Sequence, residues 1–258
     1  MFTTHQVPII RYSPINPVPA RRIGLREPFR WLSSGWQSFT ANWKPTLLFG
    51  SIFAASGAGI SRFAFSNPQM IFAFWSGFLL IAPILSMLIY HLAQRHERQE
   101  TTSMRQCGKM LASNAASGLL LVLLLALIMV AWIRTSTLVT AIYAGNLGVG
   151  FDVSGGFFSV DNFGLLIALG AVGAVFAIAT FSLLAWSMPM LARGRTDPVT
   201  AMVSSVRAVV TQPLPMLLWG SLVAMLTLAS MATFFLAFAV VFPWLGFATW
   251  QAYKQLFE

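Results

Sequence analysis

Few side chains of this 258-residue sequence could carry out chemistry, and their spacing keeps them apart. The histidines are His5, His91 and His96, and Cys107 is the sole cysteine. Three histidines and one thiol cannot supply the ligands of a haem–copper or iron–sulfur centre, and one cysteine excludes an intramolecular disulfide. The sequence has no Gly-rich phosphate loop and no Gly-x-Ser-x-Gly elbow. We therefore expect no catalytic residue, cofactor or metal site, and an enzyme is the least favoured class.

Two acidic residues flank a stretch rich in Gly and Phe. Asp152 and Asp161 lie within residues 148–163, whose alternation is typical of a small β-hairpin. We expect an external loop with solvated acids; a cation site or a contact outside the membrane is the alternative.

The composition indicates a membrane protein. Hydrophobic residues make up 57% of the chain and charged residues 9%, whereas a soluble domain carries about 25% charged residues. A net charge of +9 would indicate nucleic acid in a soluble protein. Here the charges lie between apolar blocks, which favours membrane orientation and anionic lipid headgroups over a nucleic-acid partner.

Apolar stretches long enough to cross a bilayer recur along the chain. A span needs about 20 apolar residues, and candidates are residues 46–62, 69–92, 114–133, 163–191 and 214–250. The spacing predicts an all-α, polytopic membrane helix bundle.

The last stretch is too long for one span. Residues 214–250 are 37 residues without a charge, and a single helix of that length would extend about 55 Å, against a hydrocarbon core of about 30 Å. We therefore predict two spans with a turn near residues 229–231, which gives six transmembrane helices.

Four prolines indicate an internal repeat. Pro45 and Pro215 open similar segments 170 residues apart, and Pro83 and Pro243 open another pair 160 apart. The sequence thus predicts a flexible Pro-rich arm (1–27) followed by a transmembrane domain (28–258) of three tandem hairpins: 28–100, 101–195 and 196–258.

An amphipathic helix is predicted before each hairpin. Before the second, Met104, Cys107 and Leu111 share a face, and before the third, Asp197 and Pro198 form a cap and first-turn pair. Before the first, helical spacing aligns five large apolar residues: Phe29, Leu32, Trp36, Phe39 and Trp43. These helices are expected to lie in the membrane interface, with docking of a partner protein as the alternative.

Small residues form a seam in the first span. Gly50, Ala54 and Ala58 are four apart, a spacing that lets helices approach closely. The seam is expected to pack within the chain; association with another membrane protein is the alternative.

The basic residues indicate an orientation. With six spans, fourteen Lys and Arg fall on the side of both termini, and only Arg62 and Arg134 fall on the other. By the positive-inside rule both termini face the cytoplasm. Arg134 is expected to mark the outer end of the third span.

Three segments near the C-terminal end carry a likeness to known sequences: residues 197–202, 215–219 and 243–253. Through them the chain resembles, over roughly residues 28–256, an uncharacterised family of predicted integral membrane proteins that is common in proteobacteria. In that family the segment after the last proline often reads Gly-His-Ala-Thr-Trp-His, a pair of histidines that share a helix face and could hold a metal. Here Phe247 and Gln251 replace them. The resemblance implies a membrane architecture and a bacterial inner-membrane location, but no reaction.

The near absence of charged residues in the predicted spans disfavours an ion-coupled transporter. Ion-coupled transporters place ionisable groups inside their spans, and these spans lack them. We expect a non-catalytic accessory, assembly or stabilising subunit of a larger membrane complex, with membrane lipids and other integral membrane proteins as partners. A carrier or channel for a lipid or other small apolar molecule is the alternative.

Overall fold

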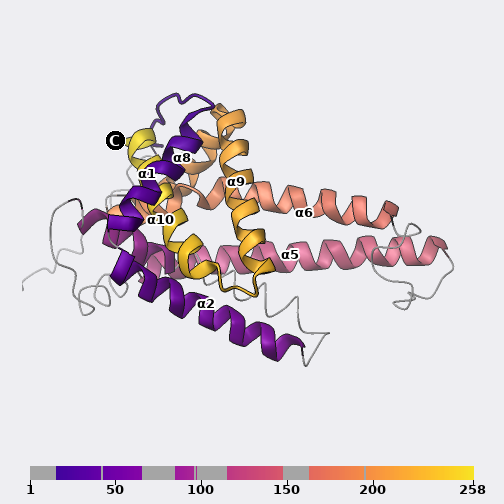
Figure 1. Cartoon of the computed structure of the whole chain (residues 1–258). Coiled ribbons are helices and arrows are strands. Elements are labelled where there is room, and N and C mark those ends of the chain that lie inside the picture. Colours follow the sequence, from indigo (N-terminus) through magenta and orange to yellow (C-terminus); the bar gives the residue numbers. More distant parts are fainter. Residues whose placement is uncertain are drawn as a thin grey trace, which may run out of the picture.

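A computed structural model describes the chain at residues 16–41, 43–65, 85–95, 97, 115–147, 163–194 and 196–258. Within these ranges it is helical and contains no strand, which confirms the all-α class there (Figure 1). Residues 85–95 are helical, and the labelled helices are α1 (Glu27–Ala41), α2 (Trp43–Phe65), α5 (Ala115–Leu147), α6 (Phe163–Leu184), α7 (Ser187–Arg193), α8 (Pro198–Thr211), α9 (Pro213–Ala232) and α10 (Phe238–Phe257). The predicted hairpin within 148–163 and the predicted amphipathic segment at 104–111 lie outside the described residues, apart from Phe163 itself.

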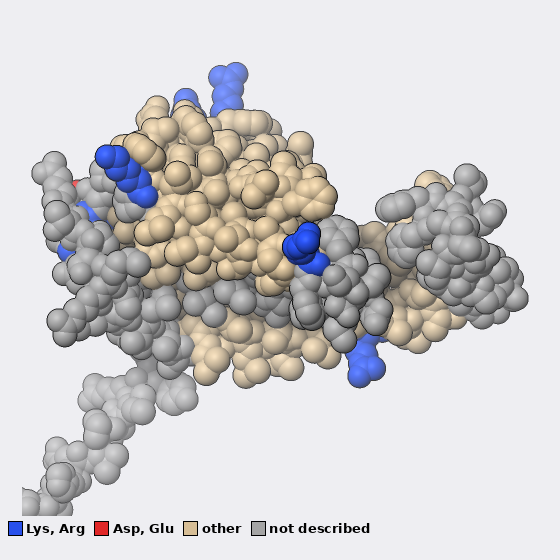
Figure 2. Space-filling model, turned by 60° about the horizontal axis from the view of Figure 1, so that its bottom comes forward, with Lys and Arg blue, Asp and Glu red and all other residues tan. Residues whose placement is uncertain are grey.

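Three helical segments of the described chain are long and apolar enough to cross a membrane: Gly118–Tyr143, Phe163–Arg193 and Pro213–Ala232. Large apolar side chains point outward along them, among them Leu123, Val175 and Leu228, each at least 60% exposed. Figure 2 shows a broad face with few charged side chains. Because such a surface requires an apolar surrounding, these helices identify a membrane protein; the count of six spans stays a prediction.

The third span differs from its predicted length. Helix α5 continues to Leu147, so Arg134 lies inside the helix, with its side chain exposed, instead of at its end. No Gly or Pro occurs between Arg134 and Gly145 to end the helix. The hydroxyls of Thr135 and Thr137 donate to carbonyls four residues earlier, at 2.9 and 2.8 Å, so these polar residues are accommodated within the helix.

The stretch 214–250 is broken into two helices, as predicted, but the turn comes later than residues 229–231. Residues 233–237 join α9 to α10. Phe234 and Phe235 take left-handed backbone angles, with φ of 51° and 68°, which is uncommon for residues other than glycine. The Phe235 ring is buried against α2 at Gly57. Packing against a distant helix therefore places the turn, and no local Gly or Pro marks it.

The core lies where α1 and α10 run together, beside α2, α7 and α9 (Figure 1). Trp31 of α1 is at its centre, with ring centroids 6.0 Å from Trp186 and 5.5 Å from Trp219, both edge-on. Helices α5 and α6 run alongside each other and project away from this core.

The four repeat prolines are only partly placed. Pro45 and Pro215 are each the third residue of their helix, and Pro243 is buried inside α10. Pro83 lies outside the described residues, so its equivalence to Pro243 stays a prediction.

Candidate functional site

Polar side chains concentrate where α1 meets the end of α10. The Nε1 atom of Trp31 donates to Oε1 of Gln255 at 2.6 Å, and Nε2 of Gln255 donates to Oε2 of Glu27 at 2.8 Å. Arg30 completes the chain by donating to Glu27 at 2.8 Å. The buried indole is thereby linked to the surface through an amide and an ion pair.

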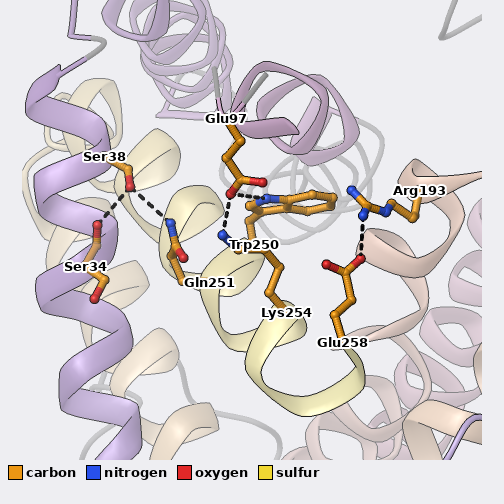
Figure 3. Close-up of polar contacts among 8 residues, drawn as sticks. All are labelled: Ser34, Ser38, Glu97, Arg193, Trp250, Gln251, Lys254 and Glu258. Carbon is orange, nitrogen blue, oxygen red and sulfur yellow. Dashed lines mark hydrogen bonds and ion pairs between the residues drawn. The ribbon is translucent and has the colours of Figure 1, made fainter. Parts of the chain in front are cut away.

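A second set of contacts lies one helical turn away (Figure 3). The Nε2 atom of Gln251 donates to the Ser38 hydroxyl at 3.2 Å, which ties α10 to α1. Lys254 forms an ion pair with Glu97, and the same carboxylate accepts from Nε1 of Trp250 at 3.1 Å.

Arg193 joins the end of α7 to the end of the chain. Its guanidinium lies 2.9 Å from the Glu258 carboxylate and 5.9 Å from the centre of the Trp250 ring (Figure 3). The paired groups are partly exposed, so each pair contributes at most about 1 kcal/mol.

An open groove of about 430 Å³ lies between α1 and the end of α10. Its lining residues are Glu27, Arg30, Trp31, Ser34, Gln251, Lys254 and Gln255. Both of its cations are already paired with carboxylates, Arg30 with Glu27 and Lys254 with Glu97. Among the described residues no three His, Cys, Asp or Glu side chains could jointly hold a metal ion. The groove offers hydrogen bonds to a ligand, and we identify no reacting pair in it.

Phe247 and Gln251, the two positions at which histidine is frequent in the family that the sequence resembles, have structural contacts here. Phe247 is buried at 1% exposure, and Gln251 holds Ser38. One position packs the core and the other joins two helices.

The five predicted apolar residues do not share one helix: α1 ends at Ala41 and Trp43 begins α2, and their exposure differs. Phe39 is buried and Leu32 partly buried, whereas Phe29, Trp36 and Trp43 are 54%, 44% and 52% exposed. The buried face also contains Trp31 and Gly35, which the sequence pattern did not single out. A Cβ on Gly35 would lie 2.6 Å from the backbone nitrogen of Ala248, so the absent side chain lets α1 approach α10.

Helix α8 begins as predicted. The Asp197 carboxylate accepts from the Thr200 backbone N–H at 2.9 Å and Pro198 occupies the first helical position. This hydrogen bond holds the pKa of Asp197 below its usual value. The face of α8 that packs inward is made of small residues such as Ala201, Ser204, Ser205 and Ala208.

The described part of the predicted arm is bound to the helices. The Val18 amide donates to the Ser204 hydroxyl at 2.9 Å, and the Arg21 amide donates to the Leu256 carbonyl at 2.8 Å. Gln212 holds both sides of this segment: its Oε1 accepts from the Ile23 amide at 2.7 Å, and its Nε2 donates to the Arg21 carbonyl at 2.9 Å. Residues 18–23 are thus held against the helices, whereas residues 1–15 of the predicted arm lie outside the described residues, and their flexibility stays a prediction.

The small-residue seam of α2 lies partly on α10. Gly50 and Ala54 are buried, whereas Ala58 is half-buried. A Cβ on Gly50 would lie 2.0 Å from the Ala239 carbonyl oxygen. This part of the seam packs within the chain.

A second small-residue face lies on α6, and the sequence analysis missed it although its spacing is readable. Gly170, Ala171, Ala174 and Ala177 are all exposed, and no described neighbouring atom lies within 4 Å of a Cβ built on Gly170. Of the most apolar part of this span, only 6% is buried against the described part of the chain. Helix α6 therefore presents small residues to its surroundings.

The comparisons with known proteins agree with the class that the helices define, a helical integral membrane protein. Residues 71–193 match the model of a family described as "Predicted integral membrane protein (DUF2189)". The matched range is the middle of the chain, not the last third on which the resemblance was most specific. No curated protein and no solved structure matches the chain.

Proposed function

We propose that this protein is a non-catalytic accessory or stabilising subunit of a larger membrane complex, and that α6 contacts a helix of that complex. The exposed small-residue face of α6 is the observation that carries the proposal. Between helices in lipid there is no hydrophobic driving force, so association depends on close van der Waals contact, which small residues permit.

The spacing of these residues fits a helix contact. Gly170 and Ala174 are four apart and Ala177 follows three later, which places all three on one side of α6. A face formed by exposed alanine and glycine gives lipid chains little to pack against, whereas a second helix can approach its backbone.

The location belongs to the same proposal. We place the protein in a bacterial inner membrane with both termini in the cytoplasm, since fourteen of sixteen Lys and Arg then face inward. A periplasm-active reporter fused after Glu258 is expected to give no activity. Strong activity would place the C-terminus in the periplasm and would refute the orientation.

The subunit role is tested by mild-detergent purification of the full-length protein followed by native mass spectrometry. The wild-type protein is expected to retain a stoichiometric protein partner. Ala174→Leu should weaken the affinity for that partner at least tenfold, because a loss of about 1.4 kcal/mol in binding free energy already corresponds to a tenfold rise in Kd.

A matched control lies on the same helix. Ala179→Leu introduces the same side chain at another exposed position, about 140° around the helix from Ala174. It should leave the partner bound. Equal behaviour of the two variants would refute the α6 contact, and a protein that purifies alone with bound lipid would favour a lipid carrier.

A further inference from the structure

The outward side of α1 and of the turn before it combines basic and large apolar side chains. Leu25, Phe29 and Trp36 are each at least 44% exposed. Arg22 and Arg26, which are near Leu25 and Phe29 in the sequence, are also exposed. We refer to these five residues as the outward face.

We propose that the outward face binds the headgroup layer of anionic phospholipids. This inference goes beyond the subunit role proposed above and does not depend on it. Three observations carry it: the position of the apolar side chains, the charge of the segment, and the aromatic residues that follow.

The apolar side chains of this face lie outside the protein core. Trp31, Gly35 and Phe39 lie on a different side of α1, roughly 110° around the helix, and pack inward. Phe29 and Trp36 are seven residues apart, two helical turns, and therefore share the outward side. A helix that buries one face in the bundle and exposes bulky apolar groups on another is suited to lie along a bilayer surface.

The charge of the segment complements an anionic surface. Residues 16–44 contain five Lys or Arg and one acidic residue, which is +4 of the net +9 of the chain. Glu27 is paired with Arg30, while Arg22 and Arg26 have no carboxylate partner among the described residues. Each basic residue near an anionic membrane contributes about 1 kcal/mol, or roughly a fivefold change in affinity.

Tryptophan side chains lie in and near the outward face. Trp36 packs edge-on against Trp244 at 5.3 Å between ring centroids, and Trp244 is itself held by a 2.8 Å hydrogen bond from its Nε1 to the Leu32 carbonyl. Trp43, at the start of α2, is exposed with the Lys44 ammonium 5.7 Å from its ring centre. Tryptophan and basic residues together are typical of the headgroup region of a membrane.

The depth of the face is tested with the full-length protein in nanodiscs of phosphatidylcholine and phosphatidylglycerol. On a Cys107→Ser background, nitroxide labels are placed at Phe29→Cys and at Gln37→Cys, an exposed position nearer the polar side of α1. We expect the label at 29 to be accessible to oxygen and shielded from a water-soluble nickel reagent, relative to the label at 37. Equal access of both labels to nickel would refute the proposal. Shielding at 29 that appears only in native membranes would assign the face to a protein partner and would also refute it.

The preference for anionic lipid is tested by removing positive charges. Arg22→Gln with Arg26→Gln should lower phosphatidylglycerol affinity about fivefold for each arginine, as measured by native mass spectrometry of retained lipid at low salt. Arg62→Gln with Arg134→Gln removes the same charge at two other exposed positions and should leave the preference unchanged. An equal loss in both double variants, or no loss in the first, would overturn the proposal. The label measurement keeps all arginines, so it remains decisive if the charge variants fold poorly.

Discussion

Gly50 of α2 lies so close to Ala239 of α10 that a Cβ on Gly50 would be 2.0 Å from the Ala239 carbonyl oxygen. No side chain can move aside to relieve this contact, because the neighbouring atom belongs to the backbone. The two helices are in contact through their main chains at this point.

Gly50→Ala is therefore expected to destabilise the protein by about 1–3 kcal/mol, the usual cost of overpacking a core. The measurement is the midpoint of thermal unfolding in detergent. Gly59→Ala is the matched control on the same helix, since a Cβ there meets nothing within 4 Å among the described atoms. Alanine also favours the helix by up to about 1 kcal/mol over glycine, so this variant should be neutral or stabilised. Similar losses in both would refute the close contact.

The cap of α8 gives a prediction with a defined pH dependence. The Thr200 backbone N–H lowers the pKa of Asp197 in the folded protein. The stabilisation from the cap is thus fully present above the ordinary pKa of the carboxyl group and is lost as the pH falls through the folded value. Asp197→Ala should cost about 1 kcal/mol at neutral pH.

Asp197→Asn separates the charge from the hydrogen bond, because asparagine caps a helix without titrating in this range. Its thermal midpoint, relative to that of the wild-type protein, should rise as the pH is lowered through the folded pKa of Asp197. A difference that stays constant with pH would show that the ionisation of Asp197 contributes nothing to stability, whereas the hydrogen bond of the cap is tested by Asp197→Ala.

How far the sequence predicts these features depends on how local their causes are. Asp197 and Pro198 start α8 through neighbouring backbone groups, and the start was predicted to the residue. The face of α1 was assigned from apolar spacing, whereas Gly35 packs inward because α10 lies against it. Trp31 is buried through its ring contacts with Trp186 and Trp219. The spacing of the α6 small residues was present in the sequence, but their exposure requires knowledge of the neighbouring helices.

Gln212 is predicted to control access to the chain before α1. Its side-chain amide forms hydrogen bonds with the Ile23 amide and the Arg21 carbonyl. Gln212→Ala therefore removes two contacts that hold this segment. Trypsin should then cleave after Arg21 or Arg22 several-fold faster, as followed by intact-mass analysis. Gln212→Glu is the matched variant: it keeps the acceptor for the Ile23 amide and loses the donor to Arg21, and it should give an intermediate rate. If both variants are cleaved like the wild-type protein, Gln212 does not limit the segment.

The turn between α9 and α10 predicts opposite results for one substitution at adjacent positions. Phe234 and Phe235 both have positive φ, and a left-handed conformation costs an ordinary residue about 1–2 kcal/mol. Phe234 is 62% exposed, so Phe234→Gly relieves the backbone, loses little burial, and should be neutral or stabilising by up to about 1 kcal/mol.

Phe235→Gly relieves the same backbone strain but removes a ring that is 1% exposed and covers Gly57. Loss of a buried phenylalanine costs about 3–5 kcal/mol, which exceeds the relief, so this variant should be destabilised by at least about 1 kcal/mol. Thermal unfolding of both proteins in one detergent gives the comparison. Equal midpoints would mean that the Phe235 ring does not anchor the turn on α2, and that the position of the turn has another cause.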